Sequence, residues 1–221
     1  MKTIIVGYGE VGKALAKVLE QYKPEIIDPQ MGLHSASVNC DILHITFPFS
    51  DKFVEQVEEY KLNHTPKYVV IHSTVPVGTC QELGAISSPI RGLHPNLEGG
   101  IRTFVKFIGG EQASEVADYF RKAGLRVILF DKAETAEAFK LYDTTYYKVC
   151  IDFAHRVKKF CEENDLNFHE VYSLPNQTYN EGYTQLGYPE YIRPVLQPIK
   201  GPIKGHCVLP NEAIIKSQET K

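Results

Sequence analysis

The residues best suited to chemistry near the start of the chain are three glycines with the spacing of a dinucleotide site. Gly7-Tyr8-Gly9-Glu10-Val11-Gly12 follows an apolar run and fits the pattern G-x-G-x-x-G. The first glycine of this pattern permits a tight turn, the second lets the backbone approach a pyrophosphate, and the third lets helix pack on strand. The N–H groups that open the helix would face the phosphates. The segment therefore predicts a cofactor-binding turn.

Asp28 predicts that the cofactor is NAD and not NADP. It ends the second predicted strand, where a carboxylate can accept hydrogen bonds from both ribose hydroxyls and would repel a 2′-phosphate. Its neighbours Pro29 and Gln30 supply no arginine for such a phosphate. The alternative interpretation is a structural glycine turn beside a solvated aspartate.

Three more residues are predicted to line the cofactor crevice because they follow predicted strands. Ser73 and Thr74 come after the strand Tyr68–Ile71, and Pro48 comes after Asp41–Phe47. In a doubly wound sheet the carboxyl ends of the strands face that crevice. For Ser73 and Thr74 the alternative is a plain strand-to-helix turn with a hydroxyl cap, which is common.

These residues need a sheet to hold them, and the pattern of residues 1–131 predicts one. Short β-rich runs alternate with helical patterns, which indicates an α/β fold with a Rossmann-type, doubly wound parallel sheet. The predicted strands are Thr3–Val6, Glu25–Ile27, Asp41–Phe47, Tyr68–Ile71, Phe104–Ile108 and Leu125–Phe130. The predicted helices are Glu10–Gln21, Asp51–Tyr60, Cys80–Leu83 and Ser114–Ala123.

The sequence after Asp131 has a different character. Ala133–Asn164 shows helical periodicity without Pro or Gly, whereas Leu174–His206 is rich in Tyr, Pro and Gly and has little periodicity. We therefore predict an NAD-binding domain over residues 1–131. Over residues 132–221 we predict a long helix followed by an irregular C-terminal segment.

The long helix is apolar on two faces, which predicts that it is buried between two bodies. One face carries Lys140, Thr144, Tyr147 and Ile151, and the opposite face carries Tyr142, Tyr146, Val149, Phe153 and Phe160. We expect one body to be the NAD-binding domain and the other a second subunit. The 133–164 helix therefore predicts a homodimer, with Lys140 in a cleft.

Composition narrows the class of protein. The formal net charge of -3 leaves no basic footprint for nucleic acid. No apolar run approaches the roughly 20 residues that span a bilayer, and the start of the chain is too short for a signal peptide. The five cysteines form no close CxxC pairs, so we predict reduced thiols and no metal site. We expect a cytoplasmic protein that acts on a small-molecule substrate.

Three segments, taken in chain order, resemble one enzyme family. Ser73–Thr79 reads Ser-Thr-Val-Pro-Val-Gly-Thr, Ala133–Leu141 resembles the start of a central helix with a catalytic lysine, and Gly201–Cys207 resembles a loop with a nucleophilic cysteine. Together they are similar to the UDP-glucose and GDP-mannose (nucleotide-sugar) 6-dehydrogenases. A Gly-Gly-His-Cys version of this loop is typical of the N-acetylmannosamine branch of that family, and its last three residues are present here as Gly205-His206-Cys207.

The resemblance implies a thiol mechanism. An alcohol that is oxidised to an acid gives up two hydrides in two steps, and a thiolate traps the aldehyde between them. Cys207 would be that thiol, Lys140 would stabilise oxyanions, and Thr144 would hold a water. The chain departs from the family at Thr144, which replaces an Asn, at Lys204, which replaces a Gly, and at Val208–Asn211, which replaces Pro-Lys-Asp.

Candidate substrate residues lie in two loops. Arg91–Gly100 could correspond to a family loop in which Asn96 replaces a glutamate that helps position water and Glu98 is retained. His94 with Pro95 also resembles prephenate dehydrogenases, which would imply a single alcohol-to-ketone oxidation; a hydrogen-bonded turn is the alternative. The second loop precedes Cys207, and its candidates for a sugar-like or acid-like substrate are Asn176, Asn180, Tyr183, Arg193 and His206.

Enzymes of the resembling family are nearly twice as long as this chain. The chain would lack their second α/β domain, which grips the nucleotide of the substrate. We therefore expect a smaller substrate, a site that another subunit completes, or lost activity. A non-catalytic, NAD-binding regulatory module is the contrasting hypothesis.

Overall fold

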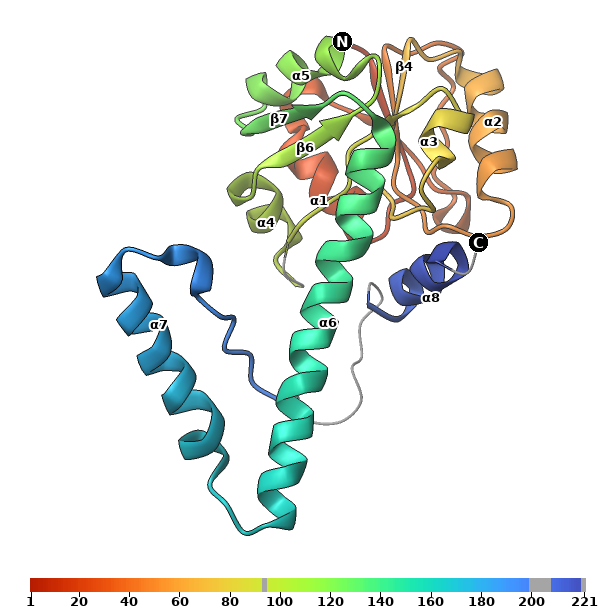
Figure 1. Ribbon diagram of the computed structural model, residues 1–221. Coiled ribbons are helices and arrows are strands. Elements are labelled where there is room, and N and C mark those ends of the chain that lie inside the picture. The colour runs from red at the N-terminus through yellow and green to blue at the C-terminus, as the bar shows by residue number, and fades with distance from the viewer. Residues whose placement is uncertain (93–94, 199–207, 220–221) are drawn as a thin grey trace. The chain divides into compact units, whose positions relative to one another are not determined.

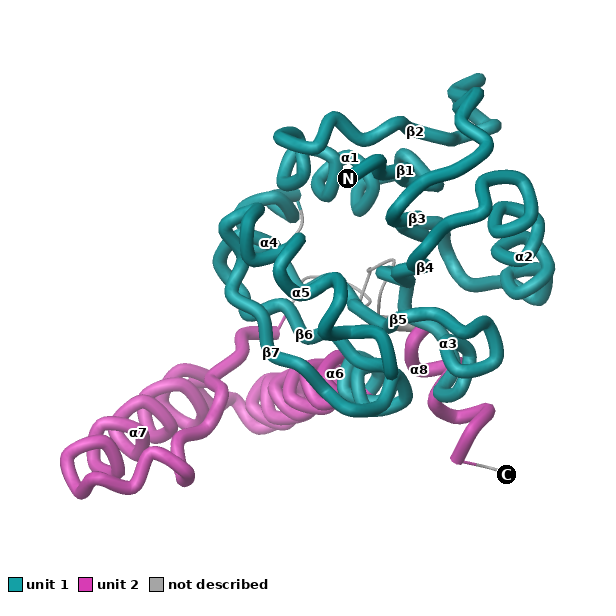
Figure 2. Tube along the Cα trace, turned by 90° about the horizontal axis from the view of Figure 1, so that it is seen from above, with its two compact units in different colours: residues 1–141 teal, residues 142–221 magenta. Residues whose placement is uncertain are grey.

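The computed structural model describes residues 1–92, 95–198 and 208–219. The chain divides into two compact units, Met1–Leu141 and Tyr142–Lys221 (Figure 2). The division falls inside the long helix α6, Ala133–Glu163. The predicted domain boundary near Asp131 precedes that helix.

Unit 1 is built on a seven-stranded sheet with the order β2-β1-β3-β4-β5-β6-β7. Figure 1 shows this sheet with α5 on one side and α2 on the other. The strands are β1 Thr3–Val6, β2 Glu25–Ile27, β3 Ile42–Ile45, β4 Tyr68–Ile71, β5 Ile86–Ser87, β6 Lys106–Gly109 and β7 Val127–Phe130. Neighbouring strands are parallel except β5 and β6, which pair antiparallel through Ser87 and Gly109. The predicted α/β class and doubly wound sheet are therefore confirmed, and the sheet is parallel as predicted except at the β5–β6 pair.

The strand order reverses between β1 and β3. The chain leaves β1 for β2 on one side, and then returns to place β3 on the other side of β1. In open α/β sheets ligands bind at such a switch point, outside the carboxyl ends of the strands. The turn that follows β1 lies at this point.

Helices cover both faces of the sheet. They are α1 Glu10–Val18, α2 Phe53–His64, α3 Thr79–Glu82, α4 Leu97–Thr103 and α5 Ala113–Lys122, with short 3-10 turns η1 Glu20–Tyr22 and η2 Pro29–Met31. β5 and α4 were not predicted from the sequence. β5 has only two residues, and α4 contains Gly99 and Gly100, which lower helix propensity.

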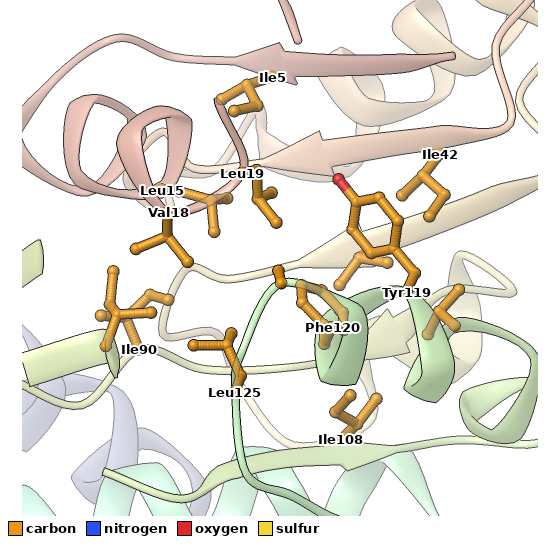
Figure 3. Close-up of a cluster of buried hydrophobic side chains, with 14 of the residues drawn as sticks. Ile5, Leu15, Val18, Leu19, Ile42, Ile90, Ile108, Tyr119, Phe120 and Leu125 are labelled. Atoms are coloured by element: carbon orange, nitrogen blue, oxygen red, sulfur yellow. The ribbon is translucent and has the colours of Figure 1, made fainter. Parts of the chain in front are cut away.

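Alternating side chains of each strand divide the core into two clusters. Ile5 of β1 packs with Leu15 and Val18 of α1 and Phe120 of α5, as Figure 3 shows. On the opposite face, Ile4 and Val6 pack with the helices α2 and α3 and with Ala133. Full burial of one such aliphatic side chain contributes about 1.5–3 kcal/mol. Packing on both faces fixes the position of each strand, and with it the position of the turns that follow the carboxyl ends of the strands.

Unit 2 comprises the rest of α6 and four further helical segments among the residues that the structure describes. They are the π-helical turn η3 His169–Ser173, α7 Leu174–Leu186, the 3-10 turn η4 Pro189–Tyr191 and α8 Val208–Glu219. The prediction that Leu174–His206 has no regular structure is wrong for its first part, which is α7. No residue of α7 is buried, and polar residues make up most of its sequence, so the sequence shows little helical periodicity of apolar residues.

Within the described ranges, the structure contains no helix that is both long enough and apolar enough to span a membrane.

Candidate cofactor-binding site

The turn after β1 needs glycine at its first and third motif positions. Gly7 has φ +94°, and a Cβ there would lie 2.9 Å from the amide nitrogen of Phe47. A Cβ on Gly12 would lie 1.9 Å from the carbonyl oxygen of Gly7, so only glycine lets α1 approach β1 this closely. Both glycines are therefore required by the fold of the turn itself.

Gly9 is different, because the fold does not need it. It has φ -70° and ψ -161°, which any residue can adopt, and a Cβ there would meet no atom within 4 Å. No side chain caps the N-terminus of α1, which Gly9 opens. The space above Gly9 and the first N–H groups of α1 fit a bound pyrophosphate, which the dipole of a helix N-terminus favours.

Thr46 is a site residue that sequence reasoning missed. Its Oγ1 lies 2.7 Å from the carbonyl oxygen of Gly7 and 2.9 Å from that of Val6, and donates to them. This hydroxyl ties the glycine turn to the end of β3 across the switch point. Its position directly after a strand could have marked Thr46 as a site residue. The sequence does not show its bonding partners, because they lie about 40 residues away.

Asp28 lies at the carboxyl end of β2 and faces the glycine turn. Its Oδ2 accepts a hydrogen bond of 2.7 Å from the N–H of Tyr8, and its Oδ1 accepts from the N–H groups of Gln30 and Met31 at 3.1 and 3.3 Å. A carboxylate offers about four lone-pair sites, so about one is left for a ribose hydroxyl. The expectation of bonds to both ribose hydroxyls therefore conflicts with these occupied sites. The negative charge remains as the feature that disfavours a 2′-phosphate.

The segments after β3 and β4 meet at the same edge. Ser73 Oγ donates a 2.5 Å hydrogen bond to the carbonyl oxygen of Phe47, which holds the two strand ends together. Thr74 is half-buried next to Ser73, and Pro48 is exposed next to Phe47. The structure thus places Pro48, Ser73 and Thr74 at the carboxyl ends of neighbouring parallel strands.

Glu137 of α6 is a second residue that sequence reasoning missed. Its carboxylate is buried, and its two oxygens accept hydrogen bonds from the N–H groups of Gly78, at 2.7 Å, and Cys80, at 2.8 Å. Burial, with the nearby Glu137 carboxylate, raises the pKa of the Cys80 thiol well above its usual range. Glu137 therefore fixes the position of the loop that follows β4. Lys140 lies about one turn further along α6 and is half-buried.

Two predicted substrate residues have structural roles in unit 1. Asn96 Oδ1 accepts a 3.0 Å hydrogen bond from the N–H of Gly99 and caps α4. Glu98 pairs with Arg102 at 3.2 Å and with Lys17 at 3.8 Å. Both side chains therefore have partners in or beside α4 in the absence of a substrate. His94, His206 and Cys207 lie outside the described residues.

The remaining predicted residues lie in unit 2. Thr144 Oγ1 accepts a 3.1 Å hydrogen bond from Nδ2 of Asn211 on α8. Arg193 stacks 3.5 Å from the ring centroid of Tyr179, next to a second ring, Tyr183. Arg193 also bonds to the side chains of Asn176 and Asn180, so four predicted substrate residues form one cluster in this unit. Among the residues described, no group of His, Cys, Asp and Glu is arranged to hold a metal.

Comparison with known proteins tests the predicted resemblance. No protein-family model matches the chain. A UDP-N-acetyl-D-mannosamine dehydrogenase of Methanocaldococcus jannaschii is 27% identical over 185 residues, which are 76% of this chain and 38% of that enzyme. The chain resembles the nucleotide-sugar dehydrogenases. The match is partial, because the chain spans well under half of the length of this relative.

Solved structures share the fold. A UDP-D-ManNAc dehydrogenase from Pyrococcus horikoshii superposes with a TM-score of 0.67 at 20% identity, over 97% of this chain and 54% of the other. The conserved protein MTH1747, described as similar to 3-hydroxyacid dehydrogenases, superposes with a TM-score of 0.63 at 14% identity, over 86% of this chain and 81% of the other. These relatives place the chain in a fold that dehydrogenases use.

Proposed function

We propose that this chain is the NAD-binding part of a dehydrogenase that oxidises an alcohol group of a sugar-like or hydroxy-acid substrate. The main support for the proposal is the geometry of the glycine turn at the switch point. Gly7 and Gly12 are required there by sterics, whereas Gly9 faces open space at an uncapped helix N-terminus. A glycine that the fold does not need is explained by a ligand that approaches its backbone closely.

The chemistry follows from the resemblance and from the residues it assigns. Bound NAD would accept one hydride in each oxidation. In the first oxidation a base would take the hydroxyl proton while the hydride leaves for NAD, which gives an aldehyde, and the Cys207 thiolate would add to the aldehyde carbon to form a thiohemiacetal. Loss of a second hydride to a second NAD leaves a thioester, and water releases the acid and the free thiol. Lys140 would stabilise the oxyanions in both steps.

The cofactor preference is tested at Asp28. We expect the wild type to bind NADH and to bind NADPH much more weakly, because the 2′-phosphate would face the Asp28 carboxylate. Asp28→Asn removes the charge, so the ratio of the two affinities, measured by calorimetry, should fall by about tenfold or more, which corresponds to ~1.4 kcal/mol. Asp41→Asn is the matched control, because Asp41 also accepts from a backbone N–H, that of Lys2, at 2.7 Å. Equal affinities of the wild type for NADH and NADPH would contradict the proposal that Asp28 selects NAD over NADP.

A homodimer through α6 is part of the proposal. Tyr142, Tyr146, Val149, Phe153 and Phe160 are between 46% and 61% exposed along this helix, and a contiguous apolar face of this kind favours burial against another molecule. We expect a dimer in sedimentation at micromolar concentration. Phe153→Glu should yield monomer or insoluble protein, whereas Lys159→Glu, at an exposed polar position of the same helix, should stay dimeric. A monomeric wild type contradicts this part of the proposal.

The second candidate is an NAD-binding module without catalysis. The structural roles of Asn96 and Glu98 favour it, because both are engaged in unit 1 without a substrate. Alkylation rates separate the candidates. Burial raises the pKa of Cys40 to about 11 and that of Cys80 well above its usual range, so neither reacts readily at neutral pH. A catalytic Cys207 should be alkylated faster than every other cysteine.

A further inference from the structure

A continuous row of hydrogen-bonded polar side chains crosses the core of unit 1. Lys106 Nζ lies 3.3 Å from Nδ1 of His72, and Nε2 of His72 lies 2.9 Å from Nδ1 of His44. Nε2 of His44 lies 3.3 Å from the hydroxyl of Tyr119, and the oxygen atom of that hydroxyl lies 3.4 Å from Oγ1 of Thr3. None of the five residues is more than 5% exposed. We call His44, His72 and Lys106 the basic cluster.

Among the described residues, the hydrogen-bond and ring contacts of the basic cluster include no negatively charged side chain. Phe120 of α5 contacts all three members, with Lys106 Nζ 5.1 Å from its ring centroid. The carbonyl oxygen of Ser88, after β5, lies 3.2 Å from Lys106 Nζ. The other titratable groups that face the cluster are the phenols of Tyr119 and, stacked on it, Tyr22. No carboxylate is among these contacts in the described part of the chain.

The geometry is that of a neutral cluster. Nδ1 of His72 lies 2.8 Å from the carbonyl oxygen of Ser88, so this nitrogen carries the proton and donates it. Nε2 of His72 then accepts from Nδ1–H of His44, and Nε2 of His44 accepts from Tyr119. Every ring nitrogen is satisfied while both imidazoles are neutral. An added proton would place an uncompensated charge in the core, which costs several kcal/mol.

Two members of the basic cluster are close in sequence to residues of the candidate cofactor site. His72 is followed by Ser73, whose hydroxyl joins the ends of β3 and β4. His44 lies in β3, two residues before Thr46, whose hydroxyl holds the glycine turn through Gly7. Loosening of these two strand ends would therefore disturb the glycine turn and the strand ends that form the candidate cofactor site.

We propose that the basic cluster makes both the stability of unit 1 and its binding of NADH dependent on pH, with acid weakening both. The part that concerns NADH rests on the proposed function. The neutral cluster keeps the ends of β3 and β4 in register under the glycine turn, and protonation loosens them.

The direction follows from the protons bound in each state. Burial lowers the pKa of Lys106 from 10.5 to about 7, so between these values the unfolded chain binds a proton that the folded chain does not. Stability therefore rises with pH across that window. Burial, and then the nearby Lys106, lowers the pKa of His44 to about 3 and that of His72 well below 6.5. Both histidines therefore add a further loss of stability as the pH falls below about 6.5.

The test compares the wild type with Lys106→Met, which removes the amine and keeps an apolar stem of similar volume. Thermal unfolding and NADH fluorescence titrations are recorded from pH 6 to pH 9. The unfolding equilibrium of the wild type should change by up to about tenfold per pH unit above pH 7, for one linked proton. Lys106→Met should unfold at a higher temperature at pH 6.5, lose most of that slope, and keep its NADH affinity at pH 6. Lys122→Met, at the exposed end of α5, should behave as the wild type.

A measurement on the wild type alone guards against a variant that does not fold. Calorimetric unfolding at pH 8, in two buffers of different ionisation enthalpy, should reveal the uptake of about one proton. No proton uptake, or the same pH slope in wild type and Lys106→Met, overturns the proposal. Wild-type NADH affinity that is constant from pH 6 to pH 9 overturns its cofactor part. If NADH binds at no pH, the proposed function fails, while the unfolding data still decide whether the basic cluster responds to pH.

Discussion

Gly9→Ala should leave unit 1 folded and remove most of its affinity for NADH. The backbone of Gly9 already has dihedral angles that alanine adopts, and the new Cβ would meet no protein atom within 4 Å. Only a ligand that lies against this backbone would clash with it. Overpacking typically costs about 1–3 kcal/mol, so NADH should bind roughly 10- to 100-fold more weakly while the melting temperature changes little.

Gly12→Ala is the matched comparison, because its effect should be on the fold. Its Cβ would lie 1.9 Å from the carbonyl oxygen of Gly7, which forces α1 away from β1. We expect a loss of stability of about 3 kcal/mol or more, visible as a lowered melting temperature. NADH fluorescence and thermal unfolding on both variants separate the two roles. Wild-type affinity in folded Gly9→Ala would mean that the open space does not hold a pyrophosphate.

Cys207→Ser should block acid formation on any substrate that the wild type oxidises to an acid. Serine cannot replace the thiolate at the aldehyde stage, so the aldehyde or a slowly reacting adduct should accumulate. NADH binding should survive, because Gly7, Gly9 and Gly12 are untouched. Lys140→Ala should slow both oxidations by ~10²–10⁴-fold, the range expected for loss of a proton-transferring or charge-stabilising group.

A screen of sugar alcohols and hydroxy acids, with NADH absorbance and product analysis as readouts, provides the measurement. Cys150→Ser is the control, because Cys150 is a half-buried thiol of α6 outside the proposed chemistry. Full NADH production by Cys207→Ser would rule out the two-step thiol route. A single oxidation, with His94 or Lys140 as the base, would then be the better account.

Local features of the chain were readable from the sequence alone. The strands β1, β2 and β4 have the predicted bounds, and α6 ends within one residue of its predicted end. The glycine turn was recognised because its strand, turn and helix are adjacent in sequence. The resemblance to nucleotide-sugar dehydrogenases was readable for the same reason, since each motif is a short continuous segment. It is confirmed by the partial match to the archaeal enzyme.

Other features were decided only by the tertiary structure, because they join residues that are distant in sequence. Thr46 and Glu137 hold turns that belong to other segments, and neither has a local pattern that reveals its partner. The number of acceptor sites that Asp28 has left for a ligand depends on three N–H groups that the fold brings to its carboxylate. The basic cluster is the clearest case. His44, His72 and Lys106 read as ordinary polar residues of strands, and only the packing of β3, β4 and β6 against α5 removes them from water and brings their nitrogen atoms together.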